Sequence, residues 1–353
     1  MKSAIIGGLL ASLVAATPVT LEARGVRGSG SNCFPLGDSA RQLPKDYSKP
    51  SVSRQDWWCT YAQTYGFLGF SFPLEDSDCS AYSNSYDSMN DAFARMKKDF
   101  GASMVRVYAP ECRQASVWEN LLKAGVNNNM AVIPQIWWGF DSNQDLWKQS
   151  QTALFSIMDK YPIAPYVFHS VEFGSEPIGD YVDGNNFVSD FQAFKVRMND
   201  HYGVPVAISE DWDRPGRLTT NNGQSLTDLG NQIKAISQQV HAHIMPYYHG
   251  KNLASSWDYI KQQVPFYKNV IGLPTFISES MWAWGTNQDH QGGDGDVGPD
   301  QYARYWYNMD DNCQFFKQYQ VGWFIHTWQG EDTFDDYLGN GKYEINPFRP
   351  RPC

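Results

Sequence analysis

Two glutamates, Glu176 and Glu279, each stand at the end of an apolar run, in the segments "VEFGSEP" and "TFISESMWAWG". A pair of carboxyl groups can cleave a glycosidic bond with retention of configuration. One group protonates the leaving oxygen, while the other, about 5 to 5.5 Å away, attacks the anomeric carbon. Repulsion between neighbouring carboxylates keeps one of them protonated and the other ionised. The alternative is a structural role, in which each glutamate only pairs with a basic residue at the rim of the fold.

Tryptophans follow several apolar runs of the same kind. They are Trp137, Trp138, Trp212, Trp282, Trp284 and Trp328. The flat apolar face of an indole suits stacking on a sugar ring, and its N–H can donate to a hydroxyl. If the runs end at one mouth, these side chains would line a sugar-binding cleft. The alternative for each of them is that it fills space in the core.

Eight short apolar runs recur along the chain, and longer amphipathic segments separate them. The runs cover residues 65–72, 103–109, 130–138, 165–174, 204–209, 240–248, 273–278 and 321–328. Continuous apolar runs that alternate with helix-length segments predict parallel strands covered by helices on their outer side. Eight of them favour an α/β fold, a closed (β/α)₈ TIM barrel formed as a single domain by residues 51–353. Active-site residues of such barrels stand where the strands end, so Glu176 and Glu279 would face one mouth.

The first two amphipathic segments carry helix signals. Met89, Phe93, Met96 and Phe100 recur at three- and four-residue intervals and predict a helix that stops near Gly101. In the second segment, Ser116 and Glu119 have the spacing of a capping box, followed by Leu121 and Leu122 and then by Gly125.

The amino-terminal residues have the pattern of an exported protein. Residues 1–16, "MKSAIIGGLLASLVAA", place a lysine before a short apolar run and small residues, which is typical of a secretory signal peptide. Residues 17–50 are rich in Gly, Ser and Pro and indicate a flexible leader or an N-terminal extension. No later run is long enough for a membrane span or a lipid-anchor tail, so we expect a secreted, extracellular or cell-wall protein without a membrane anchor, as a monomer.

Six cysteines form an even set with no C-x-x-C spacing. They are Cys33, Cys59, Cys79, Cys112, Cys313 and Cys353. In an exported chain such a set predicts disulfides rather than metal ligation, and the sequence leaves all 15 pairings open.

The charge balance excludes some partners. The chain has 38 acidic and 28 basic residues, a formal net charge of −10, and no basic run. It should therefore avoid nucleic acid and anionic surfaces. The first apolar run also lacks the G-x-G-x-x-G turn of a dinucleotide site, so no cofactor is expected.

A metal site is the competing interpretation of one segment. "VHAHIMPYYHG" brings together His241, His243 and His249, and H-x-H is a spacing that metals use. No further ligand motif accompanies it, and the acidic loops "DGNN" and "GGDGDVGPD" lack the calcium-loop pattern. We therefore expect no metal.

Short motifs in a fixed order resemble one enzyme family over most of residues 60–330. They are "VRVYAPEC", "FGSE", "SEDW", Pro246 with Tyr247, and "ESMWAWG". Fungal members of glycoside hydrolase family 17, the cell-wall β-1,3-glucanases and β-1,3-glucanosyltransferases, are similar in having I-R-x-Y near an acid and a cysteine, then V-G-S-E or V-G-N-E, D-x-W, Pro-Tyr and E-T-G-W-P.

The resemblance implies a retaining, β-glucan-active enzyme, an endo-β-1,3-glucanase or a β-1,3-glucanosyltransferase, with Glu176 as acid/base and Glu279 as nucleophile. Its partner would be a β-glucan polysaccharide or oligosaccharide. The candidate substrate-binding residues are Arg106, Tyr108, Trp137, Ser175, Trp212, Tyr247, Trp282 and Trp328. Met281 and Ala283 stand where the family has glycine and proline, which suggests a remodelled cleft and leaves another β-glycan linkage open. The alternative from a different class is a non-catalytic carbohydrate-binding protein on a hydrolase scaffold.

Overall fold

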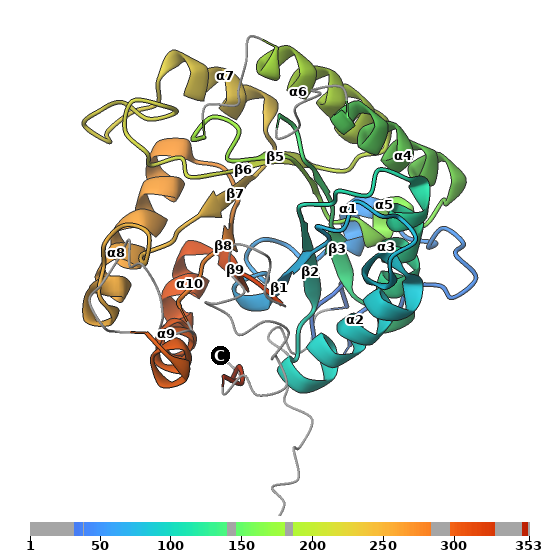
Figure 1. Ribbon diagram of the computed structural model, residues 1–353, viewed down its shortest axis with the longest axis horizontal. Coiled ribbons are helices and arrows are strands. Elements are labelled where there is room, and N and C mark those ends of the chain that lie inside the picture. The colour runs from blue at the N-terminus through green and yellow to red at the C-terminus, as the bar shows by residue number, and fades with distance from the viewer. Residues whose placement is uncertain are drawn as a thin grey trace, which may run out of the picture.

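Parallel strands form one continuous sheet that curls into a ring, with helices around its outside (Figure 1). The computed structural model describes residues 32–37, 39–139, 146–180, 186–283, 297–328 and 348–351. Within them the sheet has nine strands in the order β3-β2-β1-β9-β8-β7-β6-β5-β4. The strands are β1 (Gly66–Pro73), β2 (Met104–Tyr108), β3 (Ala131–Ile133), β4 (Gln135–Ile136), β5 (Val171–Ser175), β6 (Val206–Glu210), β7 (Val240–His243), β8 (Thr275–Glu279) and β9 (Val321–Ile325).

The predicted single-domain (β/α)₈ barrel is confirmed, and each of the eight apolar runs contains strand residues. The third run forms both β3 and β4, because Pro134 between them has no N–H to donate to a neighbouring strand. β3 pairs with β2 and β4 pairs with β5, so this one run closes the ring.

The fourth run differs from its prediction. Residues 165–174 were expected to be one strand, but the run begins inside helix α5 (Ala164–Val167), which has a proline in its first turn, and the strand starts only at Val171. A proline at this position fits a helix start, because its missing N–H would have no partner there.

The helices pack on the outer side of the ring (Figure 1). Besides α5, the described helices are α1 (Arg54–Trp57), α2 (Tyr86–Phe100), α3 (Ala115–Asn128), α4 (Leu146–Lys160), α6 (Phe187–Lys195), α7 (Asp228–Ile236), α8 (Leu253–Phe266), α9 (Pro299–Asp311) and α10 (Cys313–Tyr319). One 3₁₀ turn, η1 (Tyr82–Asn84), precedes α2, and π-helical turns, η2 (Val196–His201) and η3 (Tyr267–Ile271), extend α6 and α8.

Of the two predicted helix signals, the apolar stripe is confirmed and the capping box is not. In α2 the whole predicted stripe is buried, and Gly101 ends the helix with a φ of 69°. The capping box predicted for α3 is wrong: the N-cap is Gln114 without a side-chain cap, and Glu119 instead pairs with Lys123 and Lys160. Helix α3 also continues through Gly125, where a Cβ would lie 2.9 Å from a Val167 methyl, so this glycine serves close packing rather than termination.

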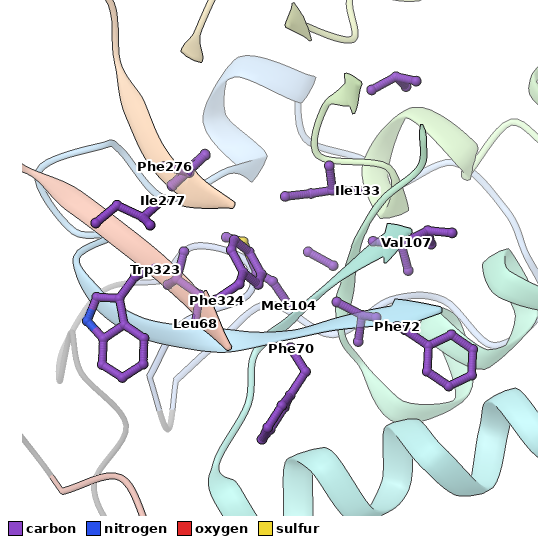
Figure 2. Packing of buried hydrophobic residues seen from close by; sticks show 14 of the residues in the cluster. Leu68, Phe70, Phe72, Met104, Val107, Ile133, Phe276, Ile277, Trp323 and Phe324 are labelled. Carbon is purple, nitrogen blue, oxygen red and sulfur yellow. The ribbon is translucent and has the colours of Figure 1, made fainter. Parts of the chain in front are cut away.

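Apolar side chains on the outer face of β1 join the sheet to the helices. Phe70 packs edge-on against Phe100, and Phe72 against Phe93, both on α2. Figure 2 shows Phe70 and Phe72 pointing from the strand toward that helix. These contacts bury the aromatic stripe that the sequence places on α2 and fix the helix against the barrel wall.

The inside of the ring is polar at its centre. Arg106 of β2 contacts Ser71 on the neighbouring strand β1 and, across the barrel interior, Glu172 on β5 and Ser209 on β6. Ser71, Glu172 and Ser209, like Arg106 itself, are fully buried. Polar groups at this depth are tolerated because they hydrogen-bond one another.

The described part of the predicted leader lies against the barrel. Phe34 and Leu43 are buried, the Leu43 N–H donates to the Asn129 side chain, and Cys33 forms a disulfide with Cys59. The predicted signal peptide, Trp284, most of the loop that follows it, and Cys353 lie outside the described residues.

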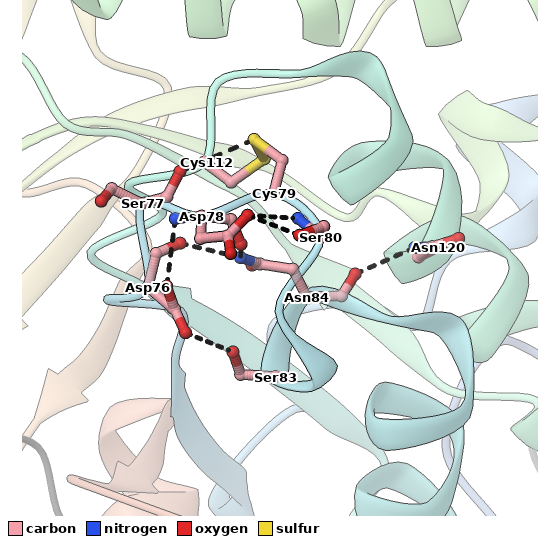
Figure 3. The surroundings of a disulfide bond; sticks show 9 residues. All are labelled: Asp76, Ser77, Asp78, Cys79, Ser80, Ser83, Asn84, Cys112 and Asn120. Carbon is pink, nitrogen blue, oxygen red and sulfur yellow. Dashed lines mark hydrogen bonds between the residues drawn. A yellow bond between two sulfur atoms is a disulfide. The ribbon is translucent and has the colours of Figure 1, made fainter.

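A second disulfide, Cys79–Cys112, joins the loop after β1 to the loop after β2 at the carboxyl ends of the strands (Figure 3). The Asn84 amide in the same loop donates to the carbonyls of Asp76 and Asp78. Cys313 is also disulfide-bonded, and the described residues include no free cysteine. The predicted disulfides are therefore confirmed for the described cysteines. In the part of the chain that the structure describes, no helix is both long and apolar enough to cross a membrane.

Candidate active site

Glu176 follows β5 in an unusual backbone conformation. Gly174 has a φ of 88°, and a Cβ there would lie 2.7 Å from the Cγ of Pro177, so only glycine fits. Glu176 itself has a φ of 45°, which is uncommon for a residue with a side chain and is one of the backbone conformations that cluster at active sites. The segment "GSEP" thus turns the chain sharply and directs the glutamate into the mouth of the barrel.

Two cations contact the Glu176 carboxylate. Its Oε1 lies 2.5 Å from Nδ1 of His243, and its Oε2 lies 3.0 Å from Nη2 of Arg214. His243 ends β7, and Arg214 lies in the loop after β6. Neither residue was among those that the sequence analysis selected as part of a catalytic site.

Glu279 ends β8 and is also paired with cations. Its Oε1 lies 2.6 Å from Nη1 of Arg106 and 3.2 Å from Nε2 of His243, and its Oε2 lies 3.9 Å from Nε2 of His326. Burial acts to raise the pKa of Glu279, but the positive charges of His243 and Arg106 hold it well below its usual value. Glu279 is therefore ionised at neutral pH.

His243 stands between the two glutamates. One ring nitrogen contacts Glu176 and the other contacts Glu279, and Nε2 also lies 2.6 Å from the Ser209 hydroxyl. Burial acts to lower the pKa of His243, but the two carboxylates raise it to about 10. The ring thus carries a positive charge that both glutamates share, and the structure brings together the two residues that the sequence singled out.

A buried charge network lies beneath Glu279. Arg106 donates from Nε to both oxygens of Glu172, each at 2.9 Å, and Nδ1 of His241 lies 2.5 Å from Glu172 Oε1. Gln135 donates to Glu172 Oε2 at 2.7 Å. Arg106, predicted to bind substrate, is fully buried and already contacts two carboxylates, so its observed place is that of a support for Glu279.

Another buried carboxyl, Glu210, lies under the loop that follows Glu176. Its Oε2 accepts from the backbone N–H groups of Ile178 and Gly179, at 2.9 and 3.1 Å. Complete burial and the nearby charge of Glu176 raise the pKa of Glu210 to about 8. Glu210 is therefore protonated at neutral pH.

This shift predicts a stability change with pH. An unfolded Glu210 ionises at about 4.5, whereas the folded one keeps its proton up to about 8, so between these values a rise in pH favours the unfolded chain. The loss amounts to about 5 kcal/mol. Glu210→Gln removes this contribution, so urea unfolding at pH 5 and pH 8 should show a smaller loss of stability in the variant. Equal losses in the two proteins would contradict the assignment.

The predicted substrate-binding aromatics differ in how much of their surface is open. Tyr108 and Trp137 are partly exposed and lie beside each other, with ring centroids 6.5 Å apart, and Tyr108 also packs edge-on against His326. The remaining four are buried, at 0 to 3% exposure; they are Trp212, Tyr247, Trp282 and Trp328. Tyr108 and Trp137 therefore present the most accessible aromatic surface of this set.

The buried aromatics have protein neighbours on their faces. Trp282 stacks on Tyr305 at 5.1 Å and packs edge-on against Tyr247, and Trp328 packs edge-on against Phe70. Ser175 is also buried, at 6% exposure, directly before Glu176. A direct contact of these residues with a sugar stays a prediction.

Trp138 shows the alternative role that the sequence left open. Its indole packs edge-on against Phe187 and donates to Asp190, both on α6, and it is 1% exposed. It therefore fills space between the sheet and its outer helices.

The three histidines considered as metal ligands have other partners. His241 pairs with Glu172, His243 lies between Glu176 and Glu279, and Nε2 of His249 lies 3.4 Å from Asp211. Over the described ranges, no group of three or more His, Cys, Asp or Glu side chains is arranged to hold a metal ion.

Comparison with solved structures finds glycoside hydrolases. The family 17 β-1,3-glucanosyltransferase from Rhizomucor miehei matches with a TM-score of 0.59 at 16% identity, over 82% of this chain and 98% of that one. An active-site mutant of the Rhizomucor miehei β-1,3-glucanosyltransferase in complex with laminaritriose gives a TM-score of 0.58 at 14% identity, over 77% of this chain and 91% of that one. The chain shares the barrel fold of these enzymes.

The likeness to other glycosidases is weaker. A family 2 β-galacturonidase from Eisenbergiella tayi bound to galacturonate has a TM-score of 0.52 at 13% identity, over 82% of this chain and 49% of that one. No protein-family model and no curated protein sequence matches the chain. At these identities the likeness concerns the fold, so the chemistry has to be argued from the side chains.

Proposed function

We propose that this chain is a secreted, retaining glycoside hydrolase or transglycosylase that acts on β-glucans. The observation that carries the proposal is the pairing of Glu176 and Glu279 with the two nitrogens of one charged imidazole, at the mouth of a glycosidase-type barrel. Two glutamates held this way at facing strand ends provide the acid/base and the nucleophile of a double displacement.

In the first step a Glu279 oxygen attacks the anomeric carbon and forms a glycosyl ester. The bond from that carbon to the leaving oxygen breaks, and Glu176 gives its proton to that oxygen. Arg106 and His243 keep Glu279 ionised, so it is ready to attack. As the ester forms, the positive charges that held the carboxylate remain beside it and favour its later departure.

In the second step Glu176, now a carboxylate, removes a proton from an acceptor hydroxyl. The acceptor oxygen attacks the anomeric carbon, the ester bond breaks, and Glu279 leaves as a carboxylate. Two inversions give net retention. Water as the acceptor yields hydrolysis, and a sugar hydroxyl yields a new glycosidic bond.

The proposed substrate is a β-1,3-glucan. Its supports are the short motifs shared with family 17, the partly exposed pair Tyr108 and Trp137, and a barrel fold like that of a β-1,3-glucanosyltransferase. The disulfides among the described cysteines support secretion, since disulfides persist in oxidising environments outside the cytosol.

The test is reducing-sugar release from β-1,3-, β-1,4-, β-1,6- and mixed-linkage glucans, with Glu279→Gln as the matched control. We expect release from the β-1,3-glucan by the wild type and almost none by the variant. Release only from another glucan would change the proposed linkage. Binding without release from any glucan would instead favour a carbohydrate-binding protein.

A further inference from the structure

Arg214 contacts three carboxylates. Its Nη2 lies 3.0 Å from Oε2 of Glu176, its Nη1 lies 3.4 Å from Oδ1 of Asp180, and its Nε lies 3.5 Å from Oδ2 of Asp211. The Arg214 side chain is 35% exposed and that of Asp180 is 47% exposed, whereas that of Asp211 is 7% exposed. One arm of the guanidinium thus reaches the proposed acid/base, and the others reach carboxylates outside the reacting pair.

Both oxygens of Glu176 face hydrogen-bond donors. Its two oxygens face Nδ1 of His243 and Nη2 of Arg214, and an arginine can donate but never accept a proton. The charged imidazole is a donor as well, because the pKa of His243 is raised to about 10 by the two carboxylates despite its burial. An O–H placed on Glu176 would lie on an oxygen that already faces a donor, so it fits best when one of these two donors withdraws.

Of the two donors, Arg214 is the one with room to move. His243 is 2% exposed and is also held by Glu279 and Ser209. Arg214 is partly open to solvent, and Asp180 and Asp211 can keep its charge paired when it leaves Glu176.

We propose that Arg214 is a positioning residue that binds Glu176 when it acts as a base and moves toward Asp180 and Asp211 when Glu176 carries its proton. This role rests on the proposed double displacement. In the first step Glu176 loses its proton to the leaving oxygen, and Arg214 returns to the carboxylate. In the second step Glu176 gains the acceptor's proton, and Arg214 withdraws again.

Asp211 is a fixed counter-charge for the withdrawn position. Burial acts to raise the pKa of Asp211, but hydrogen bonds to Asp213 and His249 lower it to about 2. Burial and the Asp211 carboxyl raise the pKa of Asp213 to about 9, so at neutral pH one proton belongs to this pair. The Tyr259 hydroxyl holds Asp213 from its other side at 3.1 Å.

Gly179 makes room for Arg214 to reach Glu176. A Cβ at this position would lie 2.8 Å from Nη1 of Arg214 and 2.7 Å from Oε1 of Glu210. Gly179→Ala would therefore push the guanidinium off its present place without removing its charge. The other ionisable groups that act on Glu176 are Glu210 and Asp180, whose own pKa values are raised by burial and by the Glu176 charge.

The test uses aryl β-glucosides or β-laminaribiosides and compares Arg214→Gln with the wild type over a pH series. Without Arg214 the proposed acid/base should keep its proton to a higher pH. The alkaline limb of the pH profile of kcat/KM should therefore move up by about one pH unit. The base form is less well held, so kcat for substrates with a good leaving group, which is limited by the second step, should fall about tenfold. Arg214→Lys should return the limb most of the way to its wild-type position, and Gly179→Ala should shift it in the same direction as Arg214→Gln.

Arg217→Gln is the matched control. Arg217 lies in the same loop, and its Nε donates to the Ile178 carbonyl at 2.7 Å, so the variant loses the same charge near the same segment. We expect no shift of the limb in this variant. If Arg214→Gln lowered kcat and kcat/KM by one factor at every pH, or if Arg217→Gln shifted the limb equally, the role of Arg214 would be overturned while the proposed function stood. A wild type inactive on all of these substrates would refute the proposed function, and this role with it.

Discussion

Replacing Glu279, the proposed nucleophile, by glycine should lower β-glucan hydrolysis by several orders of magnitude, because the proposed covalent step then has no attacking oxygen and no substitute for it. Azide can occupy the space that the side chain leaves and attack from the same face of the sugar. With an aryl β-glucoside as substrate, this single displacement inverts the anomeric centre and releases the α-glycosyl azide. Product analysis by NMR identifies the anomer.

The loss has to be separated from a loss of folding. Glu279 is 4% exposed and balances the charges of Arg106 and His243. Removing one partner of a buried ion pair costs about 3 to 5 kcal/mol. Assays therefore belong at a temperature where circular dichroism shows the variant folded, with Glu279→Gln as a second variant that keeps the shape. Near-normal glucan turnover by either folded variant would remove Glu279 from the mechanism.

Local patterns in the sequence were enough to predict the barrel. Apolar runs of strand length, alternating with stripes such as Met89 to Phe100, specify a parallel sheet covered by helices, and the structure has both. The errors arose where tertiary contacts override a local signal. Glu119 has the spacing of a capping residue, yet its carboxylate pairs with Lys123 and Lys160, and Lys160 lies on the neighbouring helix.

The two glutamates at the strand ends could be selected from the sequence, but their partners could not. His243 contacts Glu176 across 67 positions of the chain, and Arg106 contacts Glu172 across 66. Such pairs depend on which strands face each other inside the barrel, and that follows from closure of the sheet rather than from any local pattern. Two signals in the sequence bear on these partners: strand alternation places His241 and His243 on one face, and the charged Glu172 stands inside an apolar run.

The aromatic residues show why residue type alone is weak evidence for binding. Trp137 and Trp138 are neighbours at the end of one apolar run, yet Trp137 is partly exposed beside Tyr108 and Trp138 is buried against α6. Adjacent side chains on an extended segment point to opposite sides, so only one of the two can face the mouth.

Replacing Glu176 by alanine should give the opposite stereochemical outcome to Glu279→Gly. Glu279, the proposed nucleophile, remains with Arg106 beside it, so a substrate with a good leaving group, which needs no protonation, should still form the glycosyl ester. Azide then needs no general base and intercepts this ester in a second inversion. The expected product is the β-glycosyl azide, and turnover of natural glucans should fall by several orders of magnitude because their leaving oxygen does need the proton.

The comparison of the two variants decides the roles. Arg214 and His243 lose their Glu176 partner in Glu176→Ala, but Arg214 keeps Asp180 and Asp211 and His243 keeps Glu279, so we expect the variant to fold. Obtaining the α-azide from Glu176→Ala and the β-azide from Glu279→Gly would reverse the assignment of acid/base and nucleophile. Azide products of one configuration from both variants would mean that the two carboxylates do not divide the reaction as proposed. In a double displacement the variant without the nucleophile gives the inverted azide, and the variant without the acid/base gives the retained azide.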